Sequence, residues 1–210
     1  MIERALIHPS VFPSISHFVI LSQAQHWVFE AHGHYQKQTN RSRMYIYSPN
    51  GLQRLQIPIK HGRSGHQPCK EVQLEPAFDW QKNHFKSLEA AYRSTPYFEF
   101  FEDYFAPIYH KKFTFLWDLQ LESMQIACQC LGLPFAYTET ADYEHHWAEG
   151  ADYRHLVAGK KDHNTYAPYL QIFQDKHGFI NNLSIVDLLC HEGRHALDYL
   201  KQQTLPQLSL

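Results

Sequence analysis

The sequence predicts one mixed α/β domain that covers all 210 residues. Two features lead to this fold class. At the start of the chain, an apolar segment, a stretch of helical pattern and a second apolar segment follow one another, which is typical of a parallel βαβ unit. Further along, an Asn-Gly turn between two apolar segments predicts a hairpin. We therefore expect a mixed sheet that begins with a parallel βαβ unit, then a central hairpin, a helical middle and a C-terminal helix.

The βαβ unit is predicted from local patterns near the N-terminus. Residues 5–7 (ALI) form a short apolar run that ends before Pro9, as expected of a buried strand. Ser14 or Ser16 can cap the helix that follows, because both precede a run of apolar residues. Residues 26–29 (HWVF) predict the second strand.

The hairpin is predicted around a turn of proline, asparagine and glycine. Residues 43–47 and 52–59 are strand-like and flank residues 49–51 (PNG), in which Asn-Gly tolerates positive φ. Residues 61–68 contain glycine, proline and serine and predict a loop. Apolar and polar residues alternate over residues 72–74, which suggests one more strand.

The middle of the chain has helical periodicity. Residues 80–93 and 113–131 predict two helices, and the second ends at a glycine followed by a proline. The aromatic run at residues 97–101 fits helix packing better than a platform for ligands. Residues 135–138 then return to the sheet.

Two predictions concern the last third of the chain. Residues 139–167 are polar and rich in turn formers, which predicts a long surface excursion or a lid within the single domain. Ser184 and Asp187 fit a capping box at the start of the C-terminal helix.

Composition limits the class of protein. Lysine and arginine number 19 and aspartate and glutamate 21, so the net charge is −2. This balance excludes the basic surface of a general nucleic-acid-binding protein. Four cysteines without C-x-x-C spacing, no signal-peptide pattern and no long apolar run predict a cytoplasmic protein with reduced thiols and no transmembrane segment.

Sixteen histidines draw attention to sites of proton transfer or metal binding. His8 follows the first predicted strand, and Glu30 and His32 follow the second. The carboxyl ends of parallel strands are where α/β proteins bind ligands, and a carboxylate beside an imidazole makes a general base. We therefore expect His8, Glu30 and His32 to be catalytic, with a solvated ion pair as the alternative interpretation.

A basic stretch lies next to these candidates. Lys37, Asn40 and Arg41 can hold a phosphate or carboxylate, and a solvated basic turn is the alternative. Lys60, with His61 and Arg63 in the glycine-containing loop, allows the same two interpretations.

The C-terminal segment His191-Glu192-Gly193-Arg194-His195 has the form H-E-x-x-H. On a continuous helix the two imidazoles would share a face and hold zinc, with the glutamate activating a water. Only fifteen residues follow, with Asp198 as the sole obvious third ligand. Gly193 favours a break in the helix instead. A zinc metallohydrolase is therefore an alternative function, and we expect no metal at the preferred site.

Six segments, in this order, resemble the WbqC-like family of bacterial proteins. They are residues 7–14 (IHPSVFPS), 40–44 (NRSRM), 55–60 (LQIPIK), 80–84 (WQKNH), 91–98 (AYRSTPYF) and 182–189 (NLSIVDLL). The resemblance covers nearly the whole chain except residues 139–167. The family occurs in gene clusters for O-antigen and other surface polysaccharides, and glycine or acyl transferases have been suggested among its members.

The resemblance implies a transferase of surface-polysaccharide biosynthesis. It would place an aminoacyl (glycyl) or acyl group on a nucleotide- or lipid-linked sugar, with an acyl donor as second substrate and no cofactor. In that reaction His32, oriented by Glu30, takes a proton from the acceptor and His8 assists. Substrate binding falls to Lys37, Asn40 and Arg41, joined by Asn182 and Asp187 from the last matching segment. The alternatives are the zinc metallohydrolase and a non-catalytic binding module of glycan assembly; the oligomeric state stays open.

Overall fold

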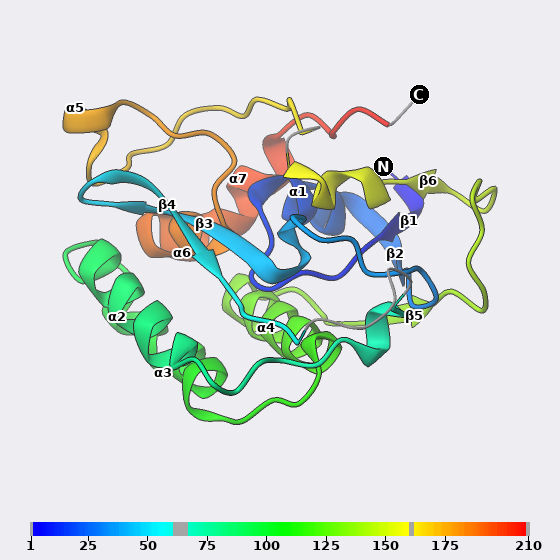
Figure 1. The fold of residues 1–210 in the computed structure, drawn as a ribbon. Helices are drawn as coiled ribbons and strands as arrows, with labels where there is room; N and C mark the ends of the chain where they lie inside the picture. Colours follow the sequence, from blue (N-terminus) through cyan, green and yellow to red (C-terminus); the bar gives the residue numbers. More distant parts are fainter. Residues whose placement is uncertain (1, 61–66, 160–161, 209–210) are drawn as a thin grey trace.

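The computed structural model describes residues 2–60, 67–159 and 162–208. In this part of the chain four strands form a parallel sheet of order β5-β2-β1-β6 (Figure 1). Its strands are β1 (Ile2–Ile7), β2 (Ala24–Phe29), β5 (Tyr137–Glu139) and β6 (Ala151–Asp152). Helix α1 (Ile15–Gln23) connects β1 to β2, so the predicted parallel βαβ unit is confirmed. The predicted return of the chain to the sheet after residue 134 is β5.

Helix α1 is the central element of the core. Every residue from 15 to 21 is buried, and the helix packs against β1, β2 and two C-terminal helices. A helix buried on all sides is expected to be apolar all round. Ser16 and His17 are the polar exceptions on α1, and both are fully buried.

The predicted hairpin is β3 (Arg43–Ser48) and β4 (Gly51–Gln56). It forms a separate two-stranded antiparallel sheet, with the turn closed by Gly51 at a φ of 94°. The strand expected at residues 72–74 is wrong as a regular element. Leu74 forms an isolated bridge with Ile59 and Gln73 forms another with Phe115, so the segment is extended but has no continuous ladder.

The helical middle consists of α2 (Trp80–Tyr92), α3 (Phe98–His110) and α4 (Leu116–Leu131). The aromatic run begins α3 and buries Phe98 and Phe101, as helix packing requires. Gly132 ends α4 with a φ of 71°, in the left-handed conformation that glycine adopts without strain. Figure 1 shows α2 and α3 below the hairpin, on the side away from the parallel sheet.

The C-terminal helix is broken in two. Helix α6 (Ile185–Glu192) ends at Gly193, whose φ is 54°, and α7 (Ala196–Gln202) follows after a short 3-10 turn. Ser184 caps α6, but its Oγ accepts from the amide of Val186 and not from that of Asp187, the third helical residue, so the expected bond of the capping box is not formed. The other half of the capping box is wrong as well, because the Asp187 carboxylate binds tyrosine hydroxyls instead of reaching back to the cap.

The polar segment 139–167 is partly built into the core. It supplies the edge strand β6 and a 3-10 turn at Arg154–Val157. Trp147, Tyr153 and Leu156 are buried, which anchors this segment to the sheet. Its few apolar residues are too widely spaced to give a periodic pattern.

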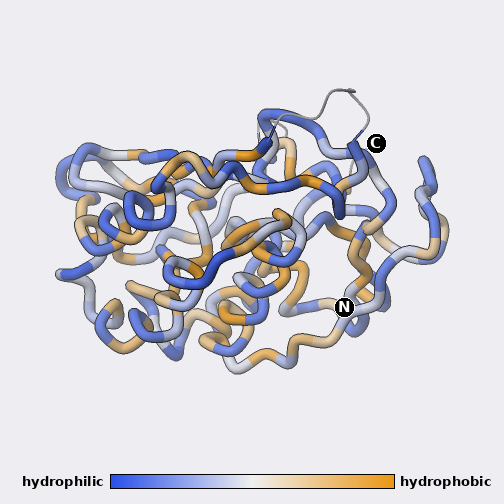
Figure 2. Tube along the Cα trace, turned by 60° about the horizontal axis from the view of Figure 1, so that its bottom comes forward, coloured by the Kyte–Doolittle hydropathy of each residue, from blue (hydrophilic) through white to orange (hydrophobic). Residues whose placement is uncertain are grey.

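Hydropathy follows the same arrangement. In Figure 2 the hydrophobic stretches lie mostly along the inner helices and strands, while the connecting loops are largely hydrophilic. Within the described residues, no helix has the length and apolar character needed to cross a membrane.

Candidate functional site

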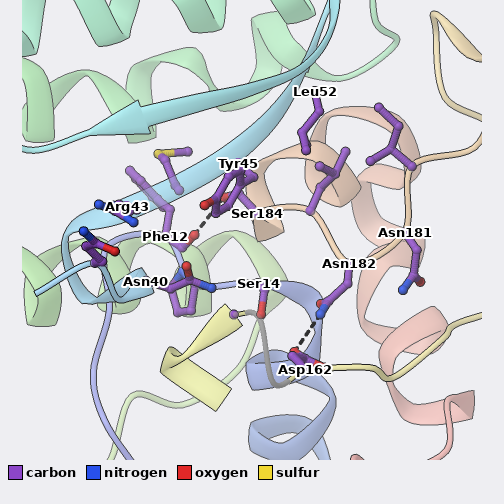
Figure 3. A pocket seen from close by; sticks show the side chains of 16 residues that line it. Phe12, Ser14, Asn40, Arg43, Tyr45, Leu52, Asp162, Asn181, Asn182 and Ser184 are labelled. Atoms are coloured by element: carbon purple, nitrogen blue, oxygen red, sulfur yellow. Dashed lines mark hydrogen bonds between the residues drawn. The ribbon is translucent and has the colours of Figure 1, made fainter. Parts of the chain in front are cut away.

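A cavity of about 380 Å³, lined by both polar and apolar side chains, lies where the chain leaves β1 and enters α1 (Figure 3). Its walls come from four separate parts of the chain. They are Phe12, Pro13, Ser14, Gln38, Asn40, Arg43, Met44, Tyr45, Leu52, Gly159, Asp162, Ile180, Asn181, Asn182, Leu183 and Ser184. Phe12, Pro13 and Ser14 belong to the connection that leaves the carboxyl end of β1, the side of a parallel sheet on which α/β proteins usually bind ligands.

Unfavourable backbone conformations are concentrated in the cavity wall. Among the described non-glycine residues, only Phe12, Gln38 and Asn182 have positive φ, with values of 39°, 62° and 55°. All three line the cavity. Positive φ is a genuine outlier for a bulky side chain and persists only where the surroundings enforce it. Here the Phe12 amide donates to Ser123 Oγ and its carbonyl accepts from Ser184 Oγ (2.8 Å). Such strain tends to occur at functional sites.

Asn182, predicted to bind substrate, connects two walls of the cavity. Its Nδ2 donates to Asp162 at 2.7 Å, a contact drawn in Figure 3, and its Oδ1 accepts from the backbone amide of Ser16. The Asp162 carboxylate also accepts from Asn164. These bonds fix an amide and a carboxylate at the start of α1.

Asn40, also predicted to bind substrate, lies in the opposite wall. A Cβ atom at Gly159 would lie only 2.7 Å from its Nδ2, so a larger residue at position 159 would displace the Asn40 amide. Arg43 lines the same wall and donates from Nε to Gln56. Lys37, which was also predicted to bind an anion, is exposed and is not part of the cavity wall.

His8 and Arg41 form a buried pair next to the cavity. Arg41 Nη2 donates to His8 Nε2 at 2.7 Å, and Arg41 Nη1 donates to the carbonyl of His34. Since a guanidinium can only donate, His8 is neutral and carries its proton on Nδ1. Burial lowers the pKa of His8 well below its usual value, and the charges of Arg41 and Arg154 lower it further. Asn40 precedes Arg41 directly, so the pair and the cavity share the 3-10 turn Asn40–Ser42.

Glu30 is completely buried, and its contacts differ from those we expected. One carboxylate oxygen accepts from the backbone amides of His32 and Gly33 and from Thr140 Oγ1. The other oxygen accepts from Arg154 Nη1 at 2.9 Å. The carboxylate therefore holds the backbone of His32, while the imidazole of His32 is exposed. Strand β2 ends at Phe29, so the alternation that would align the two side chains does not continue.

Asp187, the fifth predicted binding residue, lies in the core and not in the cavity wall. Its carboxylate accepts from the hydroxyls of Tyr92 and Tyr169 and from Gln171 Nε2. Burial raises the pKa of Asp187, while nearby His191 and these donors act in the opposite direction. The contacts give Asp187 a structural role that joins α2 to α6.

The H-E-x-x-H segment does not have the geometry of a zinc site. His191 Nε2 accepts from the Ile172 amide at 3.0 Å, and Nδ1 contacts the Asp187 carbonyl at 2.7 Å, so both ring nitrogens are occupied. The break at Gly193 separates His191 from exposed His195. In the described part of the chain, no three histidine, cysteine, aspartate or glutamate side chains are close enough to hold a metal.

The remaining predicted cations are in the loop after β4. Lys60 Nζ donates to Gln73 Oε1. His61 and Arg63 lie outside the described residues.

Sequence reasoning missed three residues of this region. Arg154, which pairs with Glu30 and Asp152, lies in the polar segment 139–167. Asp162 lies near the end of that segment, and Ser14 was considered only as a helix cap. Nothing in their spacing connects these residues, because they meet only through the tertiary fold.

The fold and the site together define an α/β protein with a cavity that has three strained residues in its wall and lies beside a buried histidine–arginine pair. The chain belongs to the WbqC-like protein family, which matches residues 8–166. A relative described as the uncharacterized protein Rv1507c of Mycobacterium tuberculosis is 25% identical, over 96% of this chain and 98% of that protein. No solved structure matches the chain significantly. The resemblance found in the sequence segments is thus confirmed.

Proposed function

We propose that the chain is a transferase of surface-polysaccharide biosynthesis. It places an aminoacyl or acyl group on a nucleotide- or lipid-linked sugar. The observation that carries this proposal is the cavity with several polar side chains in its wall, into which three strained residues are built. Membership in the WbqC-like family supports the connection to polysaccharides.

The lining of the cavity suits a sugar ligand. It offers amides at Asn40, Asn181 and Asn182, a carboxylate at Asp162 and a guanidinium at Arg43. Amides and carboxylates pair with sugar hydroxyls, and a guanidinium pairs with a phosphate or carboxylate group. The volume of 380 Å³ is within the range of about 300–1,000 Å³ that is usual for small-molecule sites.

The strand-end residues have distinct roles in this proposal. The Nδ1–H of neutral His8 donates to an oxygen of the reacting group, and Arg41 keeps His8 in that tautomer. Glu30 is a positioning residue, because it holds the backbone of His32 and through it the exposed imidazole. His32 takes the proton of the acceptor amine or hydroxyl, and Lys37 assists in binding the anionic part of the substrate.

Mass spectrometry of a deletion strain tests the proposal. Surface glycans and sugar nucleotides of the deletion strain are compared with those of the parent and of strains complemented with wild type, Asn40→Ala or Asn83→Ala. Asn83 lies on the exposed face of α2 and serves as the matched control. We expect an acyl or aminoacyl group to be lost on deletion, restored by wild type and Asn83→Ala, and not restored by Asn40→Ala. Unchanged glycans and metabolites would contradict the proposal, and tight binding of a sugar nucleotide without turnover would indicate a binding module.

A further inference from the structure

Ser14 has an unusual position for the first residue of a helix. It is the N-cap of α1, yet its side chain makes no capping hydrogen bond to the helix amides. Its Oγ lies instead 3.1 Å from Nδ1 of His17, and the residue is partly exposed in the cavity wall. A serine hydroxyl with a hydrogen bond to an imidazole, at the surface of a cavity, has the arrangement of an activated nucleophile.

His17 has no evident structural reason to be polar. It is completely buried in the core helix α1, and among the described residues its Nε2 has no hydrogen-bond partner. Buried polar atoms without partners are rare in native proteins and call for an explanation. An apolar residue would pack at this position without that cost, so the imidazole is better explained by what it does for Ser14.

The charge state of His17 fits the same role. Burial lowers its pKa to about 4, so the ring is neutral near pH 7 and its Nδ1 can accept the Ser14 proton. The Asp162 carboxylate in the cavity wall raises the pKa of His17 and so favours the imidazolium that forms during proton transfer, whereas His155 acts in the same direction as burial. Asn164 and Asn182 hold Asp162 in place.

We propose that Ser14 is a nucleophile that carries the transferred acyl group as an ester, with His17 as its general base. The proposal rests on the function proposed above and specifies how the group is transferred. Neither residue is among the strand-end candidates at His8, Glu30 and His32.

The acyl group is transferred in two half-reactions. Ser14 Oγ attacks the carbonyl carbon of an activated acyl ester or thioester while His17 Nδ1 takes its proton. The bond from that carbon to the leaving group breaks, and the leaving group departs with the proton as an alcohol or thiol. The acceptor amine or hydroxyl of the sugar then attacks the acyl-serine and loses its proton to His17. The ester bond breaks, and His17 returns the proton to Ser14.

Acylation of the purified full-length protein by p-nitrophenyl acetate tests the proposal without any natural substrate. The rate of p-nitrophenolate release is measured together with intact mass, peptide mapping and release of the acetyl group by hydroxylamine. The variants are Ser14→Ala and His17→Gln. Their matched controls are Ser22→Ala, on the same helix, and His84→Gln, a buried histidine whose pKa is also lowered to about 4.

We expect wild type and both controls to gain one hydroxylamine-labile acetyl group at Ser14. Ser14→Ala should gain no acetyl group at residue 14. The rate of acetylation of His17→Gln should be lower than that of wild type by a factor of at least about 100. Thermal unfolding shows whether each variant keeps its fold. If Ser14→Ala does not, Ser14→Cys is used instead, and the acetyl group is then expected at residue 14 as a thioester in place of the ester. A wild-type protein with no acetyl group on Ser14, or a rate unaffected by Ser14→Ala, would overturn the proposal and leave a purely structural hydrogen bond.

The outcome of the acetylation experiment can be distinguished from the outcome of the experiment on the deletion strain. Acetylation of Ser14 with unchanged glycans would retain the nucleophile and reject the proposed pathway. A lost acyl group in the glycans, without acetylation of Ser14, would mean direct transfer from donor to acceptor.

Discussion

Arg41 donates a hydrogen bond to His8 across 2.7 Å, and both side chains are buried. The two residues are 33 positions apart in the sequence, at the end of β1 and in the turn before the hairpin. The bond fixes the tautomer of His8 and attaches that turn to the parallel sheet. The cavity wall that contains Asn40 therefore depends on the buried guanidinium of Arg41.

Replacing Arg41 tests this dependence. In Arg41→Lys a single ammonium cannot reach both His8 and the His34 carbonyl, so one buried acceptor loses its donor. We expect a loss of about 1–3 kcal/mol in the free energy of unfolding, measured by urea denaturation. Arg54→Lys, on the exposed face of β4, should change it by less than about 0.5 kcal/mol. Equal stability of the two variants would contradict a structural role for the pair.

The Glu30–Arg154 ion pair is expected to be strongly coupled. Glu30 is fully buried, so removing Arg154 leaves its charge uncompensated, whereas Arg154 still pairs with Asp152 when Glu30 is removed. Arg154→Gln should therefore cost about 3–5 kcal/mol of unfolding free energy, and Glu30→Gln should cost less. In a double-mutant cycle with Arg154→Gln, the double variant should lose less than the sum of the single losses. Additive losses would mean that the two charges do not interact.

Three buried histidines make stability depend on pH. Burial lowers the pKa of His17 and of His84 to about 4 and that of His8 well below its usual value of 6.5. The unfolded chain therefore binds protons at these positions at higher pH than the folded chain does. Their stabilising contribution is complete above about pH 6.5 and decreases toward pH 4, by up to about 1.4 kcal/mol per pH unit for each histidine.

Urea unfolding between pH 4 and 8 measures this dependence. The slope over the acidic part should decrease in His84→Gln, because this variant removes one of the three groups and leaves the cavity intact. An identical slope in wild type and His84→Gln would contradict the assignment of His84 as a neutral buried residue.

Strain at Asn182 can be separated from its hydrogen bonds. Both Asn182→Gly and Asn182→Ala remove the bonds to Asp162 and to the Ser16 amide. Only alanine must also adopt the φ of 55° with a Cβ atom. We expect the glycine variant to be more stable than the alanine variant by about 1 kcal/mol in urea denaturation. Equal stabilities would mean that the backbone relaxes in the variants.

Features set by neighbouring residues were predictable from the sequence. The βαβ unit, the hairpin at Gly51 and the end of α4 at Gly132 are determined by local periodicity and by glycine conformations. The break at Gly193 was predictable for the same reason. Asn40 and Asn182 lie in the cavity wall, and their role in binding a ligand stays a prediction.

The assembly of the site was not predictable in this way. The pairing of Glu30 and His32 was expected from strand alternation, but the carboxylate instead contacts the backbone of His32 and the side chain of Arg154. Arg154 lies 124 positions from Glu30, in a segment without periodic pattern. No local rule relates two such residues.

The sequence by itself determined the α/β class, the order of most elements and the family of this protein, because these depend on short-range patterns and on recognisable segments. Only the tertiary structure decided which polar groups meet. It brought Arg41 to His8, Arg154 to Glu30, and Ser14 with His17 to the edge of the cavity. The physical reason is that hydrogen bonds and charges act over a few ångströms in space. Their partners are therefore set by the packing of the whole chain and not by distance along it.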